Sequence, residues 1–272
     1  RGLEAPGAVE LVGELEAAGA RVRVVACDVA ERAQVARLVE GIVAERPLTG
    51  VIHAAGIGDS ALVDALTTQQ LHDVLAPKAD GAWWLHEVTR GMDLAAFVLF
   101  SSAGGLVLTA GQGNYAAANV FLDALAQRRR AEGLPATSMA FGLWEVGAGL
   151  GQYLSDIDRA RMATQGVPPL SYEAGLELFA AGLRTDRPSV VPVHIDTAAL
   201  RSRTDEVPAL LRGLAPAPRR AAAAVETPAG AGELERRLVG LTVGERLRAV
   251  LELVRGEVAG VLGHSSAEAV GP

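Results

Sequence analysis

The sequence predicts an α/β protein built on a parallel sheet with helices on both faces. Short β-branched runs alternate along the chain with segments that carry apolar residues at helical spacing, which is typical of crossovers between parallel strands. Most of these runs are apolar along their whole length, as strands covered on both faces must be. Half of the 272 residues are hydrophobic, so the chain has material for a sizeable core.

Five strands are expected in order along the chain. They lie at residues 21–29, 50–56, 95–102, 136–144 and 189–195. Helical periodicity predicts three helices between them, at residues 31–45, 67–89 and 113–132. In the last helix, three consecutive alanines would let the backbone pack close to the sheet.

The C-terminal part departs from this alternation. Residues 150–183 form a helical excursion punctuated by glycines, in the position of a lid between two strands. Residues 214–232 are rich in alanine and proline and are typical of a semi-flexible linker. A helical period resumes at residue 233, so we expect a domain at 1–213, a linker at 214–232 and the start of a second domain at 233–272.

Composition disfavours several partners. The formal net charge is −7, and the basic residues are scattered or paired with acids, so neither nucleic acid nor a membrane is expected to bind. The uncharged stretch at 94–122 is interrupted by serine, glycine, glutamine and asparagine, so we interpret it as a buried strand, a loop and a helix start. Cys27 is the only cysteine and no signal peptide precedes the first strand, so a cytoplasmic protein is expected. The chain opens at Arg1 and reads as a piece of something longer.

Three segments end at the edge of the sheet where ligands bind. In an open parallel sheet that edge lies beyond the carboxyl ends of the strands. Asp28 ends one expected strand, residues 54–56 end the next, and residues 101–102 end a third. The carboxylate of Asp28 suits an adenine amino group, and capping of the following helix is the alternative. The small residues at 54–56 would let the backbone approach a flat cofactor.

Four polar residues complete this edge. Tyr115 and Asn119 are four residues apart and share a helix face, while Ser102 and Lys78 precede them. A phenol holds its proton at neutral pH and can donate it to a developing alkoxide, which a nearby ammonium makes easier. Together these groups are the set needed to reduce a ketone with a nicotinamide. The alternatives are a solvated lysine and the neighbouring Ser101 as the active hydroxyl, since successive strand residues face opposite ways.

No hydrolase or metal pattern competes. The sequence lacks GxSxG, and its five histidines are dispersed without the spacing of metal ligands. No metal site is therefore expected.

Five segments resemble the ketoreductase domain of a modular type I polyketide synthase, a branch of the short-chain dehydrogenase/reductase superfamily with a Rossmann-like fold. These segments are CDVAERAQV, GVIHAAG, LAPKADGAWWLHE, residues 97–144 with GNYAAAN at their centre, and VPVHID. The resemblance covers about residues 1–213, and the lysine upstream of the serine is typical of this branch. The tail from about residue 233 resembles the first helix of an acyl carrier domain.

The resemblance implies transfer of hydride from NADPH to the β-keto group of a polyketide held as a thioester on a phosphopantetheine. Tyr115 would donate the proton, Ser102 would hold the carbonyl oxygen, and Asn119 would orient the network. Lys78 would bind the nicotinamide ribose and tune Tyr115. The implied cofactor-binding residues are Asp28 and Val29 at the adenine and Ala54, Ala55 and Gly56 along the cofactor, together with Lys78 and Tyr115.

The implied partners are an acyl carrier domain, the other domains of the same module and a second copy in a homodimeric megasynthase. Two family features are missing. The first strand and glycine-rich turn that cradle the pyrophosphate are not in the chain, so this polypeptide alone is expected to bind NADPH poorly. The serine that carries phosphopantetheine is also not in the chain.

Stereochemical markers favour a B-type reductase without epimerisation. Asp59 survives from the Leu-Asp-Asp motif of B-type members, and Val107 stands where A-type members have tryptophan. Ala117 lacks the proline of epimerising B-type members, whereas Gln112 also occurs in A-type members. The region of Leu143 and Trp144, with the lid, would cover the substrate.

Two alternatives have different functions. The chain could be a non-catalytic scaffold or docking region of a megasynthase, which the intact set of polar residues disfavours. It could also be a freestanding dehydrogenase for small alcohols, which the linker and the carrier-like tail disfavour.

Overall fold

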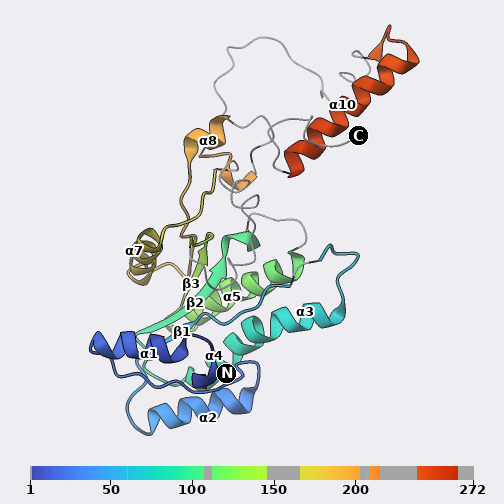
Figure 1. The fold of residues 1–272 in the computed structure, drawn as a ribbon. Helices are drawn as coiled ribbons and strands as arrows, with labels where there is room; N and C mark the ends of the chain where they lie inside the picture. Colours follow the sequence, from blue (N-terminus) through green and yellow to red (C-terminus); the bar gives the residue numbers. More distant parts are fainter. Residues whose placement is uncertain are drawn as a thin grey trace. The chain divides into compact units, whose positions relative to one another are not determined.

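The computed structural model describes residues 2–59, 61–106, 112–145, 166–202, 207, 209–214 and 238–262. The chain divides into two compact units. The first comprises Arg1–Gln152 and Leu170–His194, and the second comprises Tyr153–Pro169 and Ile195–Pro272. The strands of the described residues all belong to the first unit (Figure 1).

A parallel sheet forms the centre of the first unit. Its strands are β1 (Gly50–His53), β2 (Ala96–Ser102), β3 (Thr137–Phe141) and β4 (Ser189–Val190), in the order β1-β2-β3-β4. Each neighbouring pair is parallel, with Gly50 opposite Ala96 and Ser102 opposite Phe141. The carboxyl ends of the strands therefore meet at one edge, which confirms the parallel α/β sheet expected from the sequence.

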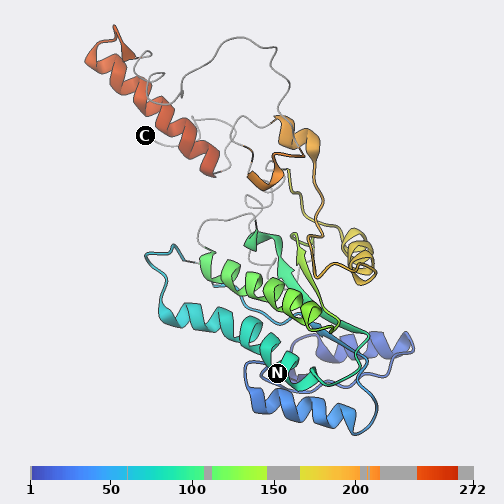
Figure 2. The same cartoon turned by 180° about the vertical axis from the view of Figure 1, so that it is seen from behind.

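Helices connect the strands, as the periodicity predicts. The α-helices are α1 (Ala8–Ala17), α2 (Arg32–Val43), α3 (Thr68–Leu75), α4 (Gly81–Thr89), α5 (Gly113–Ala131), α7 (Tyr172–Leu183), α8 (Thr197–Ser202) and α10 (Val243–Leu262). Short 3-10 turns lie at Gly2–Glu4, Ala103–Gly105 and Ala209–Leu211, and a π-helical turn at Ala76–Asp80 joins α3 to α4. Helix α3 lies alongside α5, and α2 packs on α4 (Figure 2).

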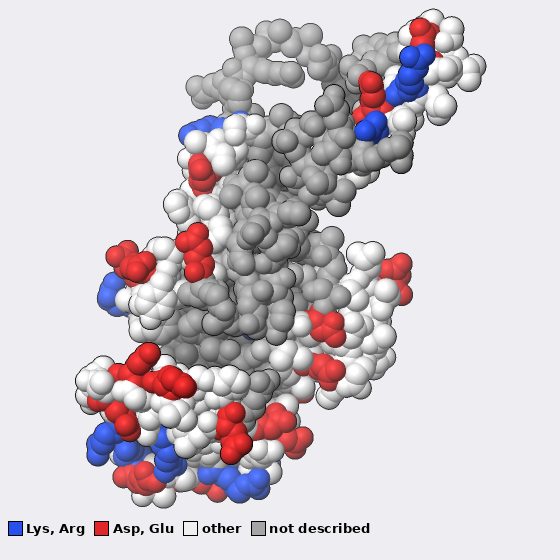
Figure 3. All heavy atoms as spheres, in the orientation of Figure 1, with Lys and Arg blue, Asp and Glu red and all other residues white. Residues whose placement is uncertain are grey.

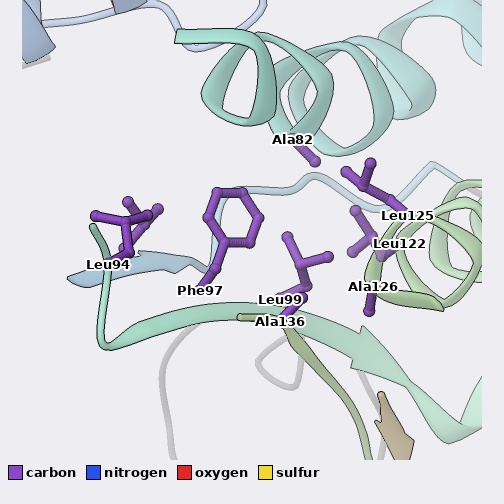
Figure 4. Close-up of a cluster of buried hydrophobic side chains, with 9 residues drawn as sticks. Ala82, Leu94, Phe97, Leu99, Leu122, Leu125, Ala126 and Ala136 are labelled. Carbon is purple, nitrogen blue, oxygen red and sulfur yellow. The ribbon is translucent and has the colours of Figure 1, made fainter. Parts of the chain in front are cut away.

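One face of the sheet packs against α4 and α5. Phe97 and Leu99 of β2 point to this face and meet Ala82 of α4 and Leu122 of α5 (Figure 4). These side chains are almost fully buried, so their contacts remove apolar surface from water and hold α5 on the sheet. Of the three consecutive alanines of α5, Ala116 and Ala118 are buried and Ala117 is exposed.

The opposite face packs against α7. Val98 and Met139 meet Leu170, Leu178 and Phe179 there. Two glycines of α7 let it approach closely. A Cβ on Gly182 would lie 2.7 Å from Met139 Cε, and one on Gly175 would lie 2.4 Å from the Trp144 ring. Helices thus cover both faces, which confirms the doubly wound, Rossmann-like arrangement.

The strand predicted at residues 21–29 is wrong. This segment pairs with no described strand, and β1 pairs only with β2. A strand needs a hydrogen-bonding neighbour, and none of the described residues supplies one beside residues 21–29 or on the outer edge of β1. Ile52 of β1 is 61% exposed, so β1 is not covered on both faces as most of the predicted strands were expected to be. The predicted strand at 189–195 is ordered as a strand only at Ser189–Val190.

The second unit contains a small apolar cluster and a long helix. Leu200 of α8 and Leu211 pack with Val167 and Ile195. Helix α10 confirms the helical period predicted near the C-terminus. The predicted linker beyond Leu214 and residues 150–165 of the predicted lid lie outside the described residues. The remainder of the predicted lid, at 166–183, contains α7, which packs on the sheet.

Charge is mixed over the face of the molecule drawn in Figure 3, where acidic and basic side chains are interspersed. Among the described residues, no helix has the length and apolar character needed to cross a membrane.

Candidate active site

Lys78 lies at the carboxyl edge of the sheet, in the π-helical turn between α3 and α4. Its side chain is 4% exposed, so it is not the solvated lysine of the alternative interpretation. The ammonium Nζ donates a hydrogen bond to the carbonyl oxygen of Phe100 in β2, at 2.9 Å. Nζ also lies 5.5 Å from the centre of the Tyr115 ring. The structure therefore brings together the lysine and the tyrosine that the sequence analysis selected.

Burial lowers the pKa of Lys78 from 10.5 to about 8, and the negative charge of Asp123 opposes this shift. Removing the ammonium from water penalises its charged form, whereas a carboxylate at a distance favours it. At neutral pH the ammonium form still predominates. Lys78 is thus a cation held in a site that is poor in water, where its field acts strongly on neighbouring groups.

Tyr115 and Asn119 lie one turn apart at the start of α5. The Asn119 Nδ2 donates to the carbonyl oxygen of Tyr115 at 2.8 Å, which confirms that the two residues are neighbours on one helix face. Asn119 is fully buried. Its Oδ1 has no hydrogen-bond partner among the described residues, which leaves a buried acceptor available to a ligand, a water molecule or an ammonium.

The two serines at the end of β2 face different surroundings. The hydroxyl of Ser101 donates to the carbonyl oxygen of Asn119 at 3.3 Å and is buried under α5. The hydroxyl of Ser102 is half-buried and accepts from the N–H of Gly104 at 3.2 Å. A Cβ on Gly104 would lie 3.3 Å from Ser102 Oγ and 3.5 Å from Gln112 Oε1. The Ser102 hydroxyl and the side chain of Gln112, the residue before α5, therefore both lie beside Gly104.

The small-residue turn after β1 lies against Lys78. A Cβ on Gly56 would come within 2.8 Å of Lys78 Cε, so a larger residue would displace that side chain. Ala54 is exposed, and Ala55 is half-buried. The Lys78 side chain therefore occupies the bare side of Gly56, and the expected contact of the turn with a cofactor stays a prediction.

Asp28 and Val29 reach the same edge from the first crossover. A Cβ on Gly81 would lie 3.1 Å from Val29 Cγ2 and 3.3 Å from His53 Cε1, so Val29 lies beside the end of β1. One carboxyl oxygen of Asp28 accepts from the N–H of Ala30 at 3.0 Å. The alternative that Asp28 caps the next helix is wrong, because the cap position of α2 is Glu31.

His53 supports the site, although the sequence analysis treated it as a simple strand-end residue. It is buried, and its Nε2 donates to the carbonyl oxygen of Lys78 at 3.2 Å. Burial lowers the pKa of His53 to about 4, so the ring is neutral at physiological pH. Its neutral N–H holds the π-helical turn that presents Lys78. Its position at the end of β1, directly before the small-residue turn, was the available signal.

The loop that contains Asp59 lies beside Gln112. Gln112 immediately precedes α5, and its backbone bridges to Ala61 in a short parallel pairing. Asp59 Oδ1 accepts from Gln70 Nε2 at 3.0 Å. The loop with the stereochemical marker Asp59 is thus attached to the start of the Tyr115 helix. Val107, the other marker, lies outside the described residues.

Leu143 and Trp144 lie after β3, toward α7. The N–H of Leu170 donates to the carbonyl oxygen of Leu143 at 2.7 Å, and the Trp144 ring packs against Phe141 and Tyr172. Trp144 therefore packs in the apolar cluster between the sheet and α7. Its expected contact with substrate stays a prediction.

The site offers hydrogen-bonding groups that suit a nicotinamide cofactor. A ribose offers hydroxyl groups, for which the Lys78 ammonium is a donor and the unpartnered Asn119 Oδ1 is an acceptor. Among the described residues, no cluster of three or more His, Cys, Asp or Glu could hold a metal ion.

A parallel α/β sheet with a buried lysine beside a tyrosine at its carboxyl edge is the arrangement of a nicotinamide-dependent reductase. Residues 1–146 match the family model described as KR domain, and this match covers more than half of the 272 residues. The chain therefore belongs to the KR domain family, the ketoreductase domains of polyketide synthases, and is an oxidoreductase domain.

Curated relatives are polyketide synthases. The spectinabilin polyketide synthase system protein NorB of Streptomyces orinoci is 53% identical over 279 residues, covering 100% of this chain and 12% of NorB. The pikromycin polyketide synthase component PikAII of Streptomyces venezuelae is 46% identical over 282 residues, covering 98% of this chain and 7% of PikAII. The chain thus spans a small part of large proteins.

Solved ketoreductases share the fold. A structure titled as A-type ketoreductases from a modular polyketide synthase is 40% identical, with a TM-score of 0.67 over 74% of this chain and 41% of that one. The first ketoreductase of the tylosin synthase is 39% identical, with a TM-score of 0.65 over 80% of this chain and 45% of that one. These matches confirm the resemblance to modular synthase ketoreductases and the α/β fold, whereas the carrier-like tail at 233–272 stays a prediction.

Proposed function

We propose that this chain reduces the β-keto group of a polyketide thioester to a β-hydroxyl with NADPH. The observation that carries the proposal is the buried Lys78 ammonium, 5.5 Å from the ring of Tyr115 at the carboxyl edge of the sheet. When bound there, NADPH supplies the hydride that becomes the new C–H bond.

Tyr115 is proposed to donate its phenolic proton to the ketone oxygen as the negative charge develops on that oxygen. The Lys78 ammonium then stabilises the phenolate through space and holds the nicotinamide ribose. Ser102 donates a hydrogen bond to the same ketone oxygen, which polarises the carbonyl. Asn119 fixes the helix turn that carries Tyr115 through its hydrogen bond to the Tyr115 carbonyl oxygen.

Asp28 and Val29 are proposed to hold the adenine, and Ala54, Ala55 and Gly56 to line the cofactor. Gly81 supports this placement, because a Cβ there would meet both Val29 and His53, the last residue of β1. Val29 therefore lies beside the end of β1. The glycine-rich turn that the resemblance implies for the pyrophosphate is not among these 272 residues.

For the alcohol configuration we propose a B-type outcome without epimerisation. Support comes from Asp59, which is held by Gln70 beside the start of α5, and from the absence of tryptophan at position 107. Two of the matched solved structures are titled A-type and A1-type ketoreductases, so chiral analysis of the product is the deciding measurement.

The proposed substrate carrier is an acyl carrier domain whose phosphopantetheine presents the thioester. We also propose a boundary at residue 213, a linker at 214–232 and a carrier-like segment at 233–272, within a homodimeric synthase located in the cytoplasm. The size of the polyketide synthase relatives supports partners within the same module.

The test compares NADPH oxidation by a protein that contains the complete ketoreductase domain and by two tyrosine variants of it, with a β-ketoacyl thioester of N-acetylcysteamine. Tyr115→Phe should leave NADPH affinity nearly unchanged and lower reduction by about 10² or more, the usual range for losing a general acid. Tyr172→Phe is the matched control, since this exposed residue of α7 loses the same hydroxyl. Equal turnover of all three proteins would contradict the proposal, and failure of the wild type to bind NADPH would favour the scaffold alternative.

A further inference from the structure

Asn114 is a buried amide at the start of α5 that the proposed reaction does not use. Its side chain is 1% exposed, and the structure gives it three hydrogen bonds. Displacing a buried amide with this many partners would lower the stability of the fold, because each buried polar group that loses its partner stays desolvated without a hydrogen bond. The three partners belong to three different segments of the first unit.

The carbonyl side of the amide supports Tyr115. Asn114 Oδ1 accepts from the backbone N–H of Tyr115 at 2.9 Å. The first N–H groups of a helix have no intrahelical acceptor, and Gln112, the cap residue of α5, supplies no side-chain hydrogen bond. Asn114 therefore does part of the capping of α5 from within its first turn, at the residue proposed to donate the proton.

The amino side of the amide holds the loop after β1 and the helix after it. Asn114 Nδ2 donates to the carbonyl oxygen of Asp59 at 2.9 Å and to that of Gln70 at 3.3 Å. Gln70 Nε2 in turn donates to Asp59 Oδ1 at 3.0 Å. Asp59 is thus fixed at its carbonyl by Asn114 and at its carboxylate by Gln70.

Gln70 is itself held in place. It forms a capping box with Thr67, in which its Oε1 accepts from the Thr67 N–H at 3.1 Å and its own N–H donates to Thr67 Oγ1 at 3.2 Å. Hydrogen bonds therefore connect Thr67, Gln70, Asp59 and Asn114 in sequence. Asn114 connects this network to the backbone N–H of Tyr115.

We propose that Asn114 is a positioning residue that sets the Asp59 loop relative to Tyr115 and so determines which face of the ketone is presented for reduction. The proposal rests on the proposed function, because it requires that Tyr115 protonate the ketone and that Asp59 lie beside the substrate. The side-chain amide suits this role because one group accepts from the Tyr115 segment and donates to the Asp59 segment, so the two segments share a single anchor.

The diagnostic substitution is Asn114→Asp. A carboxylate of nearly the same shape keeps an acceptor for the Tyr115 N–H, and a negative charge in the first turn of a helix is favourable. In its ionised form it cannot donate, so it would face the carbonyl oxygens of Asp59 and Gln70 without hydrogen bonds and release the loop. The helix start is preserved while the link to Asp59 is broken.

A second variant reaches the same link from the other side. Gln70→Glu keeps an oxygen for the Thr67 capping box but removes the donor to Asp59 and places two carboxylates together. Gln69→Ala is the matched control, since Gln69 is an exposed residue of α3 next to Gln70 and its side chain donates to Asp73.

The experiment measures the ratio of the two alcohol products by chiral chromatography, the KM and kcat for a β-ketoacyl thioester of N-acetylcysteamine, and NADPH affinity, all in the full-length protein. Asn114→Asp and Gln70→Glu should each lower the product ratio about three- to tenfold, the effect of losing a hydrogen bond of ordinary strength. KM for the ketone should rise, NADPH affinity should stay unchanged, and Gln69→Ala should match the wild type. Hydrogen exchange of the backbone at residues 57–66 should accelerate in Asn114→Asp, and this readout does not depend on activity.

An unchanged product ratio in both variants, with the wild type active, would overturn the role of Asn114 and leave the proposed function intact. A loss of kcat with the ratio intact would also overturn it, because that result means that Asn114 only stabilises the fold. Absence of reduction in the wild type would overturn the proposed function and this inference together. If residues 57–66 exchanged hydrogen at the same rate in Asn114→Asp as in the wild type, the link between Asn114 and the loop would be refuted, whether or not the protein reduces the ketone.

Discussion

The ammonium nitrogen of Lys78 lies 5.5 Å from the centre of the Tyr115 ring and donates to the carbonyl oxygen of Phe100 at 2.9 Å. A cation over an aromatic face is attracted by the ring quadrupole, and the attraction increases where water is excluded. The carbonyl of β2 thus fixes the charge beside the phenol, so the sheet itself positions the charge that would stabilise a phenolate.

Replacing this charge should separate activity from stability. Burial of Lys78 lowers its pKa from 10.5 to about 8, which corresponds to about 3 kcal/mol of folding free energy lost at pH 7. Lys78→Met removes that cost and loses a hydrogen bond worth about 1 kcal/mol. The free energy of unfolding at pH 7 should therefore rise by about 2 kcal/mol in urea titrations, while reduction falls by about 10² or more.

The control for this prediction is Arg46→Met, which removes an exposed cation just after α2. It should change neither the free energy of unfolding nor the rate of reduction. A Lys78→Met protein that is less stable than the wild type at pH 7 would show that the ammonium costs nothing in the folded state.

The same pKa fixes the direction of the pH dependence. Because the folded-state pKa lies below the unfolded value, the unfolded chain binds the proton more tightly between about pH 8 and 10.5. The cost is therefore complete below about pH 8 and is relieved as the pH rises to about 10.5. The stability advantage of Lys78→Met over the wild type should disappear across that interval.

Lys78 is the only lysine in the sequence, so its titration can be followed directly. Carbon-13 NMR of a lysine-labelled chain should give one titrating Cε signal with a midpoint near pH 8, and reduction should fall with a similar midpoint as the ammonium is lost. A midpoint near 10.5 would mean that the ammonium is solvated and that its burial is wrong.

Much of the fold could be predicted because periodicity and strand composition are local. The helix expected at 113–132 is α5 (Gly113–Ala131), and the strand expected at 95–102 is β2 (Ala96–Ser102). The strand expected at 21–29 failed because strand formation depends on a neighbour, which local sequence does not supply.

The site could be predicted in its residues but not in its contacts. The i,i+4 relation of Tyr115 and Asn119 follows from helix geometry. The bond from Lys78 to Phe100 joins residues 22 positions apart, and that from Asn114 to Asp59 joins residues 55 apart, so both required the tertiary structure. The pattern Thr67-x-x-Gln70 was readable as a capping box, but its further bond to Asp59 was not.

A methyl group at Gly56 should disturb the site without unfolding the protein. A Cβ there would come within 2.8 Å of Lys78 Cε, and the buried lysine chain has little room to move away. Gly56→Ala should lower reduction by about tenfold or more, since small displacements of a positioned group have large effects on rate.

Gly91→Ala is the control for this change, because a Cβ at Gly91 would meet nothing within 4 Å. Thermal unfolding of both variants should remain close to that of the wild type. Full activity of Gly56→Ala would show that the small-residue turn does not position Lys78.

Close approach of α7 to the sheet should depend on Gly175. A Cβ there would lie 2.4 Å from the Trp144 ring, which also packs against Phe141 and Tyr172 and so cannot shift freely. Gly175→Ala should lower the free energy of unfolding by about 1–3 kcal/mol, as overpacking of a core does. Gly41→Ala is the matched helical control. A Cβ at Gly41 of α2 would lie 3.7 Å from its nearest neighbour, an Arg23 side-chain nitrogen, so the gain in helix propensity should raise stability by up to about 1 kcal/mol. If urea titration gave both variants the same increase, α7 would not be packed against Trp144 as the structure describes.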